Sequence, residues 1–221
     1  MSTIKQYFFN RFSSFSLVGT SMLFSLILLM IRMKLTHSFF YLFLVWNLFL
    51  ATIPFLITSY LASLKKLYKF GFALAFFTWL AFLPNAPYII TDLMHLRLKT
   101  NSYLWLDILV VTSFALNGML LLYLSVLDIT ILLKPYVNNR FIKYGTGAIF
   151  FLCGLGIYLG RFLRYNSWEI ALNPKPIIHD LFHMLSAPNQ NKEAWLFTLL
   201  FGAFLNIGFW MFNTIHRVTL K

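Results

Sequence analysis

The sequence predicts an all-α, polytopic membrane helix bundle, and three observations carry this prediction. Of the 221 residues, 60% are hydrophobic and 11% are charged. A soluble domain of this size cannot bury so much apolar surface. The charged residues also leave six uncharged stretches of 17 to 30 residues, and a helix needs about 20 apolar residues to cross a bilayer. These stretches lack the alternating pattern of membrane barrel strands.

Six transmembrane helices in a single membrane domain, residues 1–221, are therefore expected. No internal repeat and no linker rich in Pro, Gly or Ser divides the chain. The first apolar stretch is too long for the core of a signal peptide and lacks a small-residue cleavage site, so we expect it to be retained. The spans are predicted at residues 12–31, 38–63, 70–91, 105–128, 144–163 and 194–215.

The net charge of +12 arises from Lys and Arg residues that are spread over all the loops. This distribution is typical of membrane topology and anionic lipid, and it argues against nucleic acid as a partner. With six spans, the side that carries both termini holds ten of the 18 Lys and Arg residues. The positive-inside rule then predicts a protein of the cell membrane with both termini in the cytoplasm.

The third stretch contains the sequence "LPNAPYIITDLMHL", residues 83–96. The 14 apolar residues before it would form a helix of about 21 Å, which is too short to cross the bilayer. Pro84 and Pro87 each lack an amide donor and disfavour helical geometry in the residue before them. We therefore expect the helix to break at 84–87, near the outer interface. A second short helix should follow, with Asn85 or Ala86 near its cap.

Polar residues of this segment are candidate ligand-binding residues. Tyr88, Asp92 and His95 recur at helical spacing and should share one face, with Asn85 just before them. A broken helix exposes backbone polar groups, which membranes tolerate only where protein or water covers them. The alternative is a helix hairpin with an interfacial tyrosine and ordinary caps.

A second polar stretch, "GIYLGRFLRYNSWEI", covers residues 156–170 at the end of the fifth span. Arg161 and Arg164 are three residues apart, so their guanidinium groups should project from one side and could bind a carboxylate or phosphate. They could instead pair with acidic side chains of the two motifs or reach lipid phosphates. Asn166 and Glu169 have the spacing of a capping box.

These two stretches, together with Asp107, resemble a family of bacterial integral membrane proteins known as domain of unknown function 1361. The resemblance runs from about the second span to the sixth. The family pattern has Asp where this chain has Glu169, a change that keeps the charge. The resemblance implies a multi-pass bacterial membrane protein and implies no activity.

The segment "IIHDLFHML" places His179 and His183 four residues apart with Asp180 between them. This spacing can hold a metal, but two His and one Asp leave the ligand set incomplete. Apolar residues line the opposite side, so we expect an outer amphipathic helix on the membrane surface. The sequence predicts no metal site and no cofactor.

Near the middle of the second, fourth and sixth predicted spans lie three asparagines, Asn47, Asn117 and Asn206. We expect them to hydrogen-bond between helices.

Two functional hypotheses remain, and no recognised catalytic fingerprint predicts a reaction. In the first, an outer-face polar pocket binds an anionic lipid or a lipid-linked precursor of the cell envelope. Its candidate residues are Asn85, Tyr88, Asp92, His95, Arg161, Arg164, Asn166 and Glu169. In the second, the protein is a non-catalytic membrane subunit whose polar cluster is a structural salt-bridge network, and it holds a membrane-protein partner.

Overall fold

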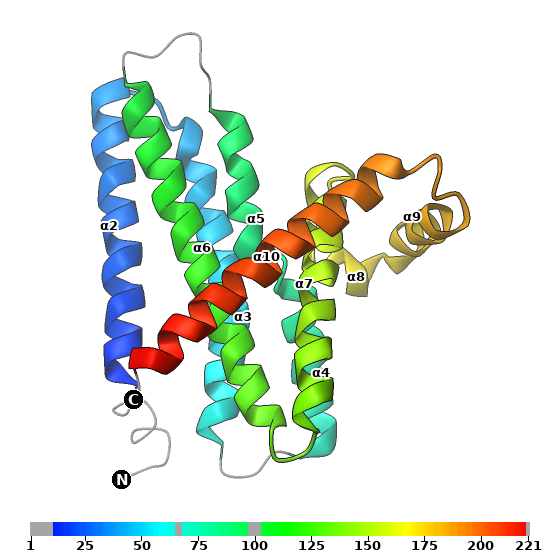
Figure 1. Ribbon diagram of the computed structural model, residues 1–221. Coiled ribbons are helices and arrows are strands. Elements are labelled where there is room, and N and C mark those ends of the chain that lie inside the picture. Colours follow the sequence, from blue (N-terminus) through cyan, green and yellow to red (C-terminus); the bar gives the residue numbers. More distant parts are fainter. Residues whose placement is uncertain (1–10, 65–67, 97–102, 220–221) are drawn as a thin grey trace. The chain divides into compact units, whose positions relative to one another are not determined.

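The computed structural model describes residues 11–64, 68–96 and 103–219, and these residues form helices and no strands (Figure 1). Six helices are long and apolar enough to cross a membrane. They cover Ser14–Thr36, Phe40–Ser63, Lys69–His95, Leu104–Leu133, Asn139–Arg161 and Lys192–His216. The all-α class and the six spans are thus confirmed. The chain forms two compact units, Met1–Asp128 and Ile129–Lys221, so each is described by itself. The single domain over 1–221 stays a prediction.

The N-terminal unit contains the first four spans. Its elements are α2 (Phe12–Thr36), η1 (Phe40–Leu42), α3 (Phe43–Ser63), α4 (Lys69–Phe82), α5 (Asn85–Tyr88), η2 (Ile89–His95) and α6 (Leu104–Leu133), whose last turn passes into the second unit. α2 ends at Thr36, and the next residue, His37, caps it in a left-handed conformation with φ 49°. Left-handed residues commonly end helices in this way.

Two arginines, one at the N-cap of α2 and one near its C-terminal end, form ion pairs with two aspartates of α6. Arg11 donates to Asp128 at 2.6 Å, and Arg32 donates to Asp107 at 2.8 Å. The arginine that comes first in the chain pairs with the aspartate that comes second, so α2 and α6 are antiparallel neighbours (Figure 1). Between the two pairs, the Asn117 side chain donates to Ser25 Oγ at 2.9 Å.

The third span is interrupted, as predicted, but it does not turn. Leu83 and Pro84 both keep right-handed helical geometry, and the chain continues through α5 into the 3₁₀ helix η2. The interruption lies inside the candidate span Lys69–His95, and its place near the outer interface stays a prediction. The cap of α5 is Pro84, and Asn85 follows it as the first residue of the helix, so Asn85 lies near the cap as predicted.

Local hydrogen bonds explain why the chain stays helical. Pro87 has no N–H for the Leu83 carbonyl, and that carbonyl accepts from the Ala86 N–H at 3.2 Å. The Phe82 carbonyl, which an α-helix would pair with the Ala86 N–H, accepts from the Asn85 side-chain amide at 2.9 Å. The Asn85 side chain therefore replaces the backbone donor that the proline displaces.

Close packing on α6 holds this interruption in place. A Cβ at Gly118 would meet the backbone carbonyl of Ala86, so only glycine lets the two segments approach so closely. The Trp79 indole N–H donates to Ser125 Oγ at 2.6 Å, which fixes α4 against the same helix.

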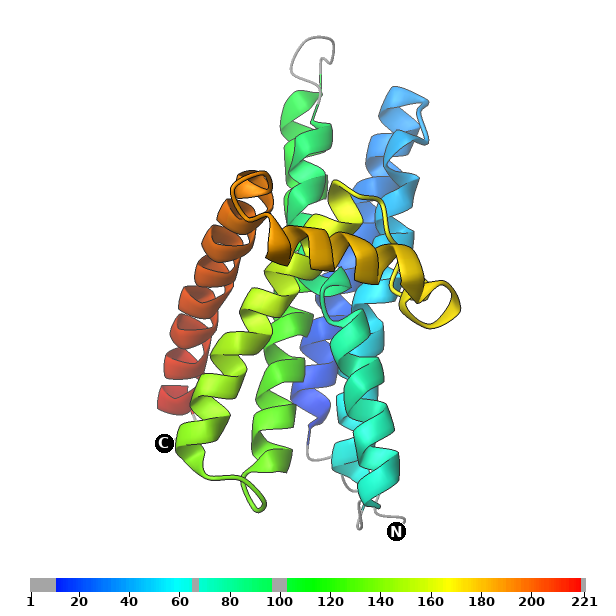
Figure 2. The same cartoon turned by 90° about the vertical axis from the view of Figure 1, so that its right-hand side faces the viewer.

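The C-terminal unit contains α7 (Asn139–Arg161), α8 (Glu169–Leu172), α9 (Pro174–Ser186) and α10 (Lys192–Thr219). α7 packs closely on α10, because a Cβ at Gly154 would lie 2.8 Å from the Thr198 carbonyl oxygen. The Asn206 amide donates to the Gly147 carbonyl at 3.3 Å. Figure 2 shows α9 running across the direction of α7 and α10.

All three mid-span asparagines hydrogen-bond between helices. Asn117 contacts Ser25, Asn206 contacts Gly147, and Asn47 contacts Asp92. This prediction is confirmed.

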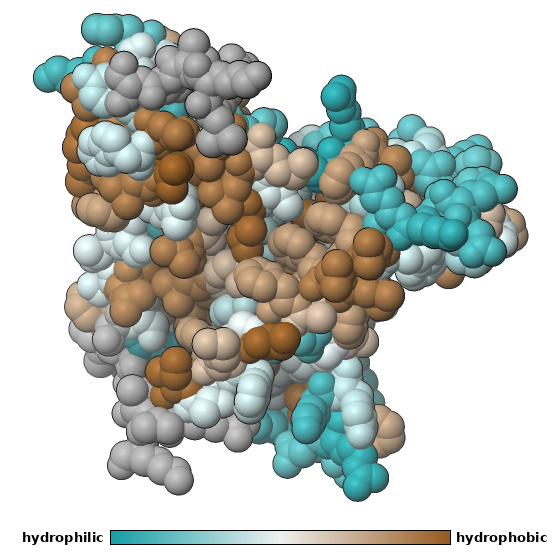
Figure 3. All heavy atoms as spheres, turned by 45° about the horizontal axis from the view of Figure 1, so that its top comes forward, coloured by the Kyte–Doolittle hydropathy of each residue, from teal (hydrophilic) through white to brown (hydrophobic). Residues whose placement is uncertain are grey.

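Apolar side chains cover much of the surface of the spans, as Figure 3 shows in brown. On α10, for example, Trp210 is 70% exposed. Such a surface suits lipid and would be unfavourable in water. Composition, spans and surface together describe a multi-pass membrane protein.

Candidate functional site

Asp92 is a buried acidic residue near the end of the third span. It lies on η2, and only 1% of its surface is exposed. One carboxylate oxygen accepts a 2.8 Å hydrogen bond from the side-chain amide of Asn47 on α3. The other lies 4.0 Å from Nε2 of His95, whose side chain is 42% exposed. A buried carboxylate is thus connected to a partly exposed imidazole.

The 3₁₀ geometry of η2 explains this pairing. In a 3₁₀ helix residues three apart eclipse each other, so Asp92 and His95 lie on one side. Phe43 and Phe40 pack edge-on against the His95 ring, with centroids at 5.3 and 6.5 Å. Tyr88 precedes η2 and is half-buried, and its carbonyl accepts from the Thr91 hydroxyl at 2.6 Å.

The end of α7 carries the two predicted arginines. Arg161 is the last residue of α7 and is half-buried, whereas Arg164 is exposed. Arg164 has a φ of 63°, and the chain then bends so that the Tyr165 N–H donates to the Leu159 carbonyl at 3.1 Å. Glycine is the residue usually found at such angles. An arginine here costs of order 1–3 kcal/mol of backbone strain.

Asn166 and Glu169 are joined by local hydrogen bonds at the start of α8, whose N-cap is Trp168. The Glu169 carboxylate accepts from the Asn166 backbone N–H at 2.6 Å and lies 3.5 Å from its side-chain amide. The carboxylate half of the predicted capping box is therefore present. The Asn166 side chain points back to Glu169 as a donor, so both residues have a structural task.

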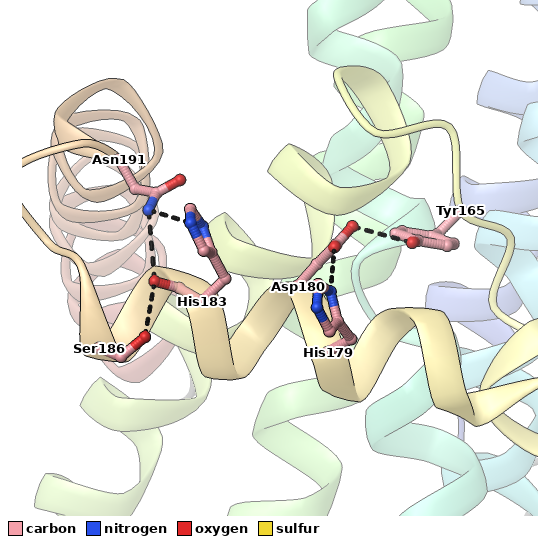
Figure 4. Close-up of polar contacts among 6 residues, drawn as sticks. All are labelled: Tyr165, His179, Asp180, His183, Ser186 and Asn191. Atoms are coloured by element: carbon pink, nitrogen blue, oxygen red, sulfur yellow. Dashed lines mark hydrogen bonds and ion pairs between the residues drawn. The ribbon is translucent and has the colours of Figure 1, made fainter.

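A chain of polar contacts joins this motif to α9 (Figure 4). The Tyr165 hydroxyl donates to Asp180 at 2.9 Å, and the other Asp180 oxygen lies 3.3 Å from Nδ1 of His179. The hydrogen bond to Asp180 is the largest cause that raises the pKa of Tyr165, because ionised phenol could not donate it. This hydrogen bond fixes the middle of α9 to the segment that follows α7.

The C-terminal end of α9 is also fixed by hydrogen bonds. The Trp195 indole N–H donates to the Met184 carbonyl at 3.1 Å, and the Asn191 amide donates to the Ala187 carbonyl at 2.9 Å. Asn191 also lies 3.3 Å from Nδ1 of His183, as Figure 4 shows. Among the residues that the structure describes, no group of three or more His, Cys, Asp or Glu side chains could hold a metal ion.

The amphipathic character of α9 is confirmed. Ile177 and Met184 are buried on one side. Ile178, Phe182 and Leu185 form an adjacent apolar stripe that is 61%, 71% and 67% exposed. This exposed stripe is what a helix at a membrane surface presents to lipid.

The structure thus brings together Asp92 and His95 in the N-terminal unit, and Asn166 and Glu169 in the C-terminal unit. The predicted outer-face pocket would combine residues of both units, and it stays a prediction.

Sequence reasoning missed two site residues. Asn47 was expected only as a helix–helix contact, although its place within an apolar span was a signal of a buried polar partner. Tyr165 lies between Arg164 and Asn166 in the second motif, and no pattern in the sequence predicts its contact with Asp180.

The comparisons agree with the sequence motifs. No curated protein and no solved structure matches the chain. A family model described as "Protein of unknown function (DUF1361)" matches residues 46–207. This range includes both motifs and well over half of the chain, so the chain belongs to the DUF1361 family.

Proposed function

We propose that the protein binds an anionic amphiphile, either a lipid or a lipid-linked precursor of the cell envelope, where α7 ends. In this proposal Arg161 and Arg164 hold the anionic group. A guanidinium can form two parallel hydrogen bonds with a phosphate or carboxylate, which gives both affinity and orientation. The polar stretch follows the candidate span Asn139–Arg161, which supports a position at the level of the lipid headgroups.

The backbone of Arg164 is the observation that carries the proposal. A φ of 63° at an exposed residue could be relieved by glycine. The chain has arginine instead, and strained residues of this kind cluster at functional sites. We infer that the side chain of Arg164 is needed there for binding.

α9 would supply the apolar half of the same site. The Tyr165–Asp180 hydrogen bond links α9 to the residue directly after Arg164. The exposed stripe of Ile178, Phe182 and Leu185 is then available to acyl chains. A cationic end beside an apolar helix fits a molecule with an anionic head and an apolar tail.

The test is the lipid that co-purifies with the protein in detergent-free polymer nanodiscs, identified by mass spectrometry. The double variant Arg161→Gln, Arg164→Gln should lose an anionic amphiphile that the wild type retains. Arg140→Gln is the matched control, because Arg140 lies in the first turn of the same helix. Equal retention in the double variant and the control would contradict the proposal.

A second function, that of a membrane scaffold, is favoured by the ion pairs of the N-terminal unit. Asp107 and Asp128 are held by Arg32 and Arg11, so these charges serve the fold. A scaffold would keep its lipids in the Arg161→Gln, Arg164→Gln variant. A scaffold would instead lose a co-purifying membrane protein when apolar residues on its lipid-facing surface are substituted.

A further inference from the structure

The turn between α6 and α7 carries the positive charge at one end of the C-terminal unit. Lys134 follows the end of α6, and Arg140 and Lys143 lie in the first turns of α7. All three side chains are exposed. Residues 134–144, here called the basic hairpin, contain these three cations and no acidic residue, which gives a formal charge of +3.

Local hydrogen bonds hold the backbone of the basic hairpin. Pro135 lacks the N–H that would continue α6, and the Tyr136 N–H donates to the Leu133 carbonyl at 3.0 Å. The Asn138 side chain accepts from the Arg140 N–H at 3.0 Å and so caps the start of α7. Backbone groups and a cap thus close the turn, which leaves the charged side chains to partners outside it.

The acidic residues of this unit lie at its other end, and they are Glu169, Asp180 and Glu193. Glu169 comes after the end of α7, and Asp180 is hydrogen-bonded to Tyr165 just beyond that end. The 23 residues of α7, about 35 Å at 1.5 Å per residue, separate these two carboxylates from the start of the helix.

Helix packing places Glu193 at that end as well. The Asn206 amide donates to the Gly147 carbonyl. Further along α7, Gly154 packs on Thr198, which comes earlier in α10. α10 therefore runs antiparallel to α7 (Figure 2), and Glu193 at its start is level with the end of α7. The three acidic residues of this unit are thus all far from the basic hairpin.

Exposed aromatic side chains accompany these cations. Those of the basic hairpin are Tyr136, Phe141 and Tyr144. Trp210 of α10 is exposed too. It lies level with Lys143, because each is four residues from the hydrogen bond that joins α7 and α10. Tyr and Trp rings gather where apolar lipid meets water, so cations and rings together suit the headgroup region of a membrane.

The basic hairpin joins two candidate membrane spans, Leu104–Leu133 and Asn139–Arg161. It therefore lies where the chain would leave a bilayer and enter it again. At such a position long Lys and Arg side chains keep their stems along apolar surface and bring their charges to the headgroup phosphates. The sequence predicts the cytoplasm on this side, and cytoplasmic leaflets carry anionic lipid.

We propose that the basic hairpin binds the anionic headgroups of the membrane leaflet at its level. Lipid phosphates accept charge-assisted hydrogen bonds from Lys134, Arg140 and Lys143. Each cation near an anionic surface raises the local affinity about fivefold, so the three act by their sum. A single change such as Arg140→Gln leaves two of them in place. The attraction is screened by salt, and it selects anionic lipids as a class, unlike the site at the end of α7, whose ligand is retained through purification.

Photo-crosslinking of the full-length protein in phosphatidylcholine vesicles tests this proposal. Two probes in equal trace amounts, a phosphatidylglycerol and a phosphatidylcholine, carry the same diazirine near the glycerol backbone. Mass spectrometry of the digested protein measures the adducts on residues 134–144. At about 0.1 M salt the ratio of anionic to zwitterionic adducts should be well above one. At about 1 M salt, where the Debye length falls to about 3 Å, it should approach one.

Three double variants separate the charge of the basic hairpin from the charge of the whole protein. Lys134→Gln, Lys143→Gln should lower the ratio about fivefold or more, because two of the three cations are lost. Lys134→Arg, Lys143→Arg keeps the charges and should keep the ratio. The control Lys175→Gln, Lys192→Gln removes two exposed lysines at the other end of the unit, and it should leave the ratio on residues 134–144 unchanged.

Three results would overturn the proposal. The first is an equal yield of both adducts in the wild type, which would fit a partner other than lipid. The second is an unchanged ratio in the glutamine variant of the basic hairpin. The third is an equal loss in the control or in the arginine variant, because neither removes charge from the hairpin. Arg161 and Arg164 are kept throughout, so the result does not depend on the site at the end of α7.

Discussion

Asp107 and Asp128 lie 21 residues apart on α6, and they accept hydrogen bonds from Arg32 and Arg11, respectively. These two arginines are also 21 residues apart in the chain. The two pairs fix one antiparallel register between the helices. The Arg32–Asp107 pair is almost fully buried, with side-chain exposures of 4% and 1%. Arg32 also donates to the Ser38 carbonyl at 2.9 Å and stacks on Tyr41 at 4.6 Å.

Loss of one partner of this buried pair should destabilise the fold strongly. Arg32→Met removes the arginine partner of the buried Asp107 carboxylate, and breaking a buried pair in this way costs about 3–5 kcal/mol. The double variant Arg32→Met, Asp107→Leu should lose much less, because no orphan charge remains. The free energy of unfolding in mixed micelles measures both. Additive losses would mean that the pair does not form.

Gly118 should be intolerant of even a methyl group. Gly118→Ala drives a Cβ into the Ala86 carbonyl, and such overpacking costs about 1–3 kcal/mol. Gly19→Ala is the matched control, since nothing lies within 4 Å of a Cβ there. Thermal unfolding should show a loss for the first variant and none for the second. Equal stability of the two would refute the close contact.

The role of Asn85 should depend on Pro87. Asn85→Ala leaves the Phe82 carbonyl without its side-chain donor, which costs about 1–3 kcal/mol. In a Pro87→Ala background the new N–H can serve the Leu83 carbonyl, and the Ala86 N–H can return to Phe82. Asn85→Ala should then cost little. A double-mutant cycle on unfolding free energies measures this coupling, and a coupling energy of zero would argue against the compensation.

The Tyr165–Asp180 contact should be visible in a titration. The hydrogen bond to Asp180 raises the pKa of Tyr165, so the contact stabilises fully below the ordinary phenol pKa of about 10. It is lost as the pH rises through the raised pKa. The ultraviolet difference between wild type and Tyr165→Phe reports this titration. Asp180→Asn should lower the midpoint, and an unchanged midpoint would exclude Asp180 as the cause.

Sequence patterns predicted the spans because burial in lipid requires long uncharged runs. The charges that end two of these runs also indicate the α2–α6 register. The runs after Arg11 and after Asp107 have the same length and end in charges of opposite sign. Two antiparallel helices of this kind can pair their charges at both ends.

The interruption at Pro84 was predicted, and its geometry was not. Proline chemistry says which amides are missing, but whether the chain turns depends on which other donors reach the freed carbonyls. Here the Ala86 N–H and the Asn85 side chain do so. The pairing of Asp92 with His95 followed from local spacing, whereas the contact with Asn47 depends on how α3 packs against η2. Such long-range packing is not encoded in local spacing.

The claim on which the account depends is that the chain crosses a membrane repeatedly. It is tested most directly by single cysteines in a Cys153→Ala background, labelled in intact cells with a membrane-impermeant thiol reagent. Tyr68→Cys and Asn138→Cys should be shielded until the cells are permeabilised, and Asn189→Cys should react at once. The reverse pattern would overturn the prediction of cytoplasmic termini. The same reactivity at all three positions before permeabilisation would contradict the membrane-spanning fold itself.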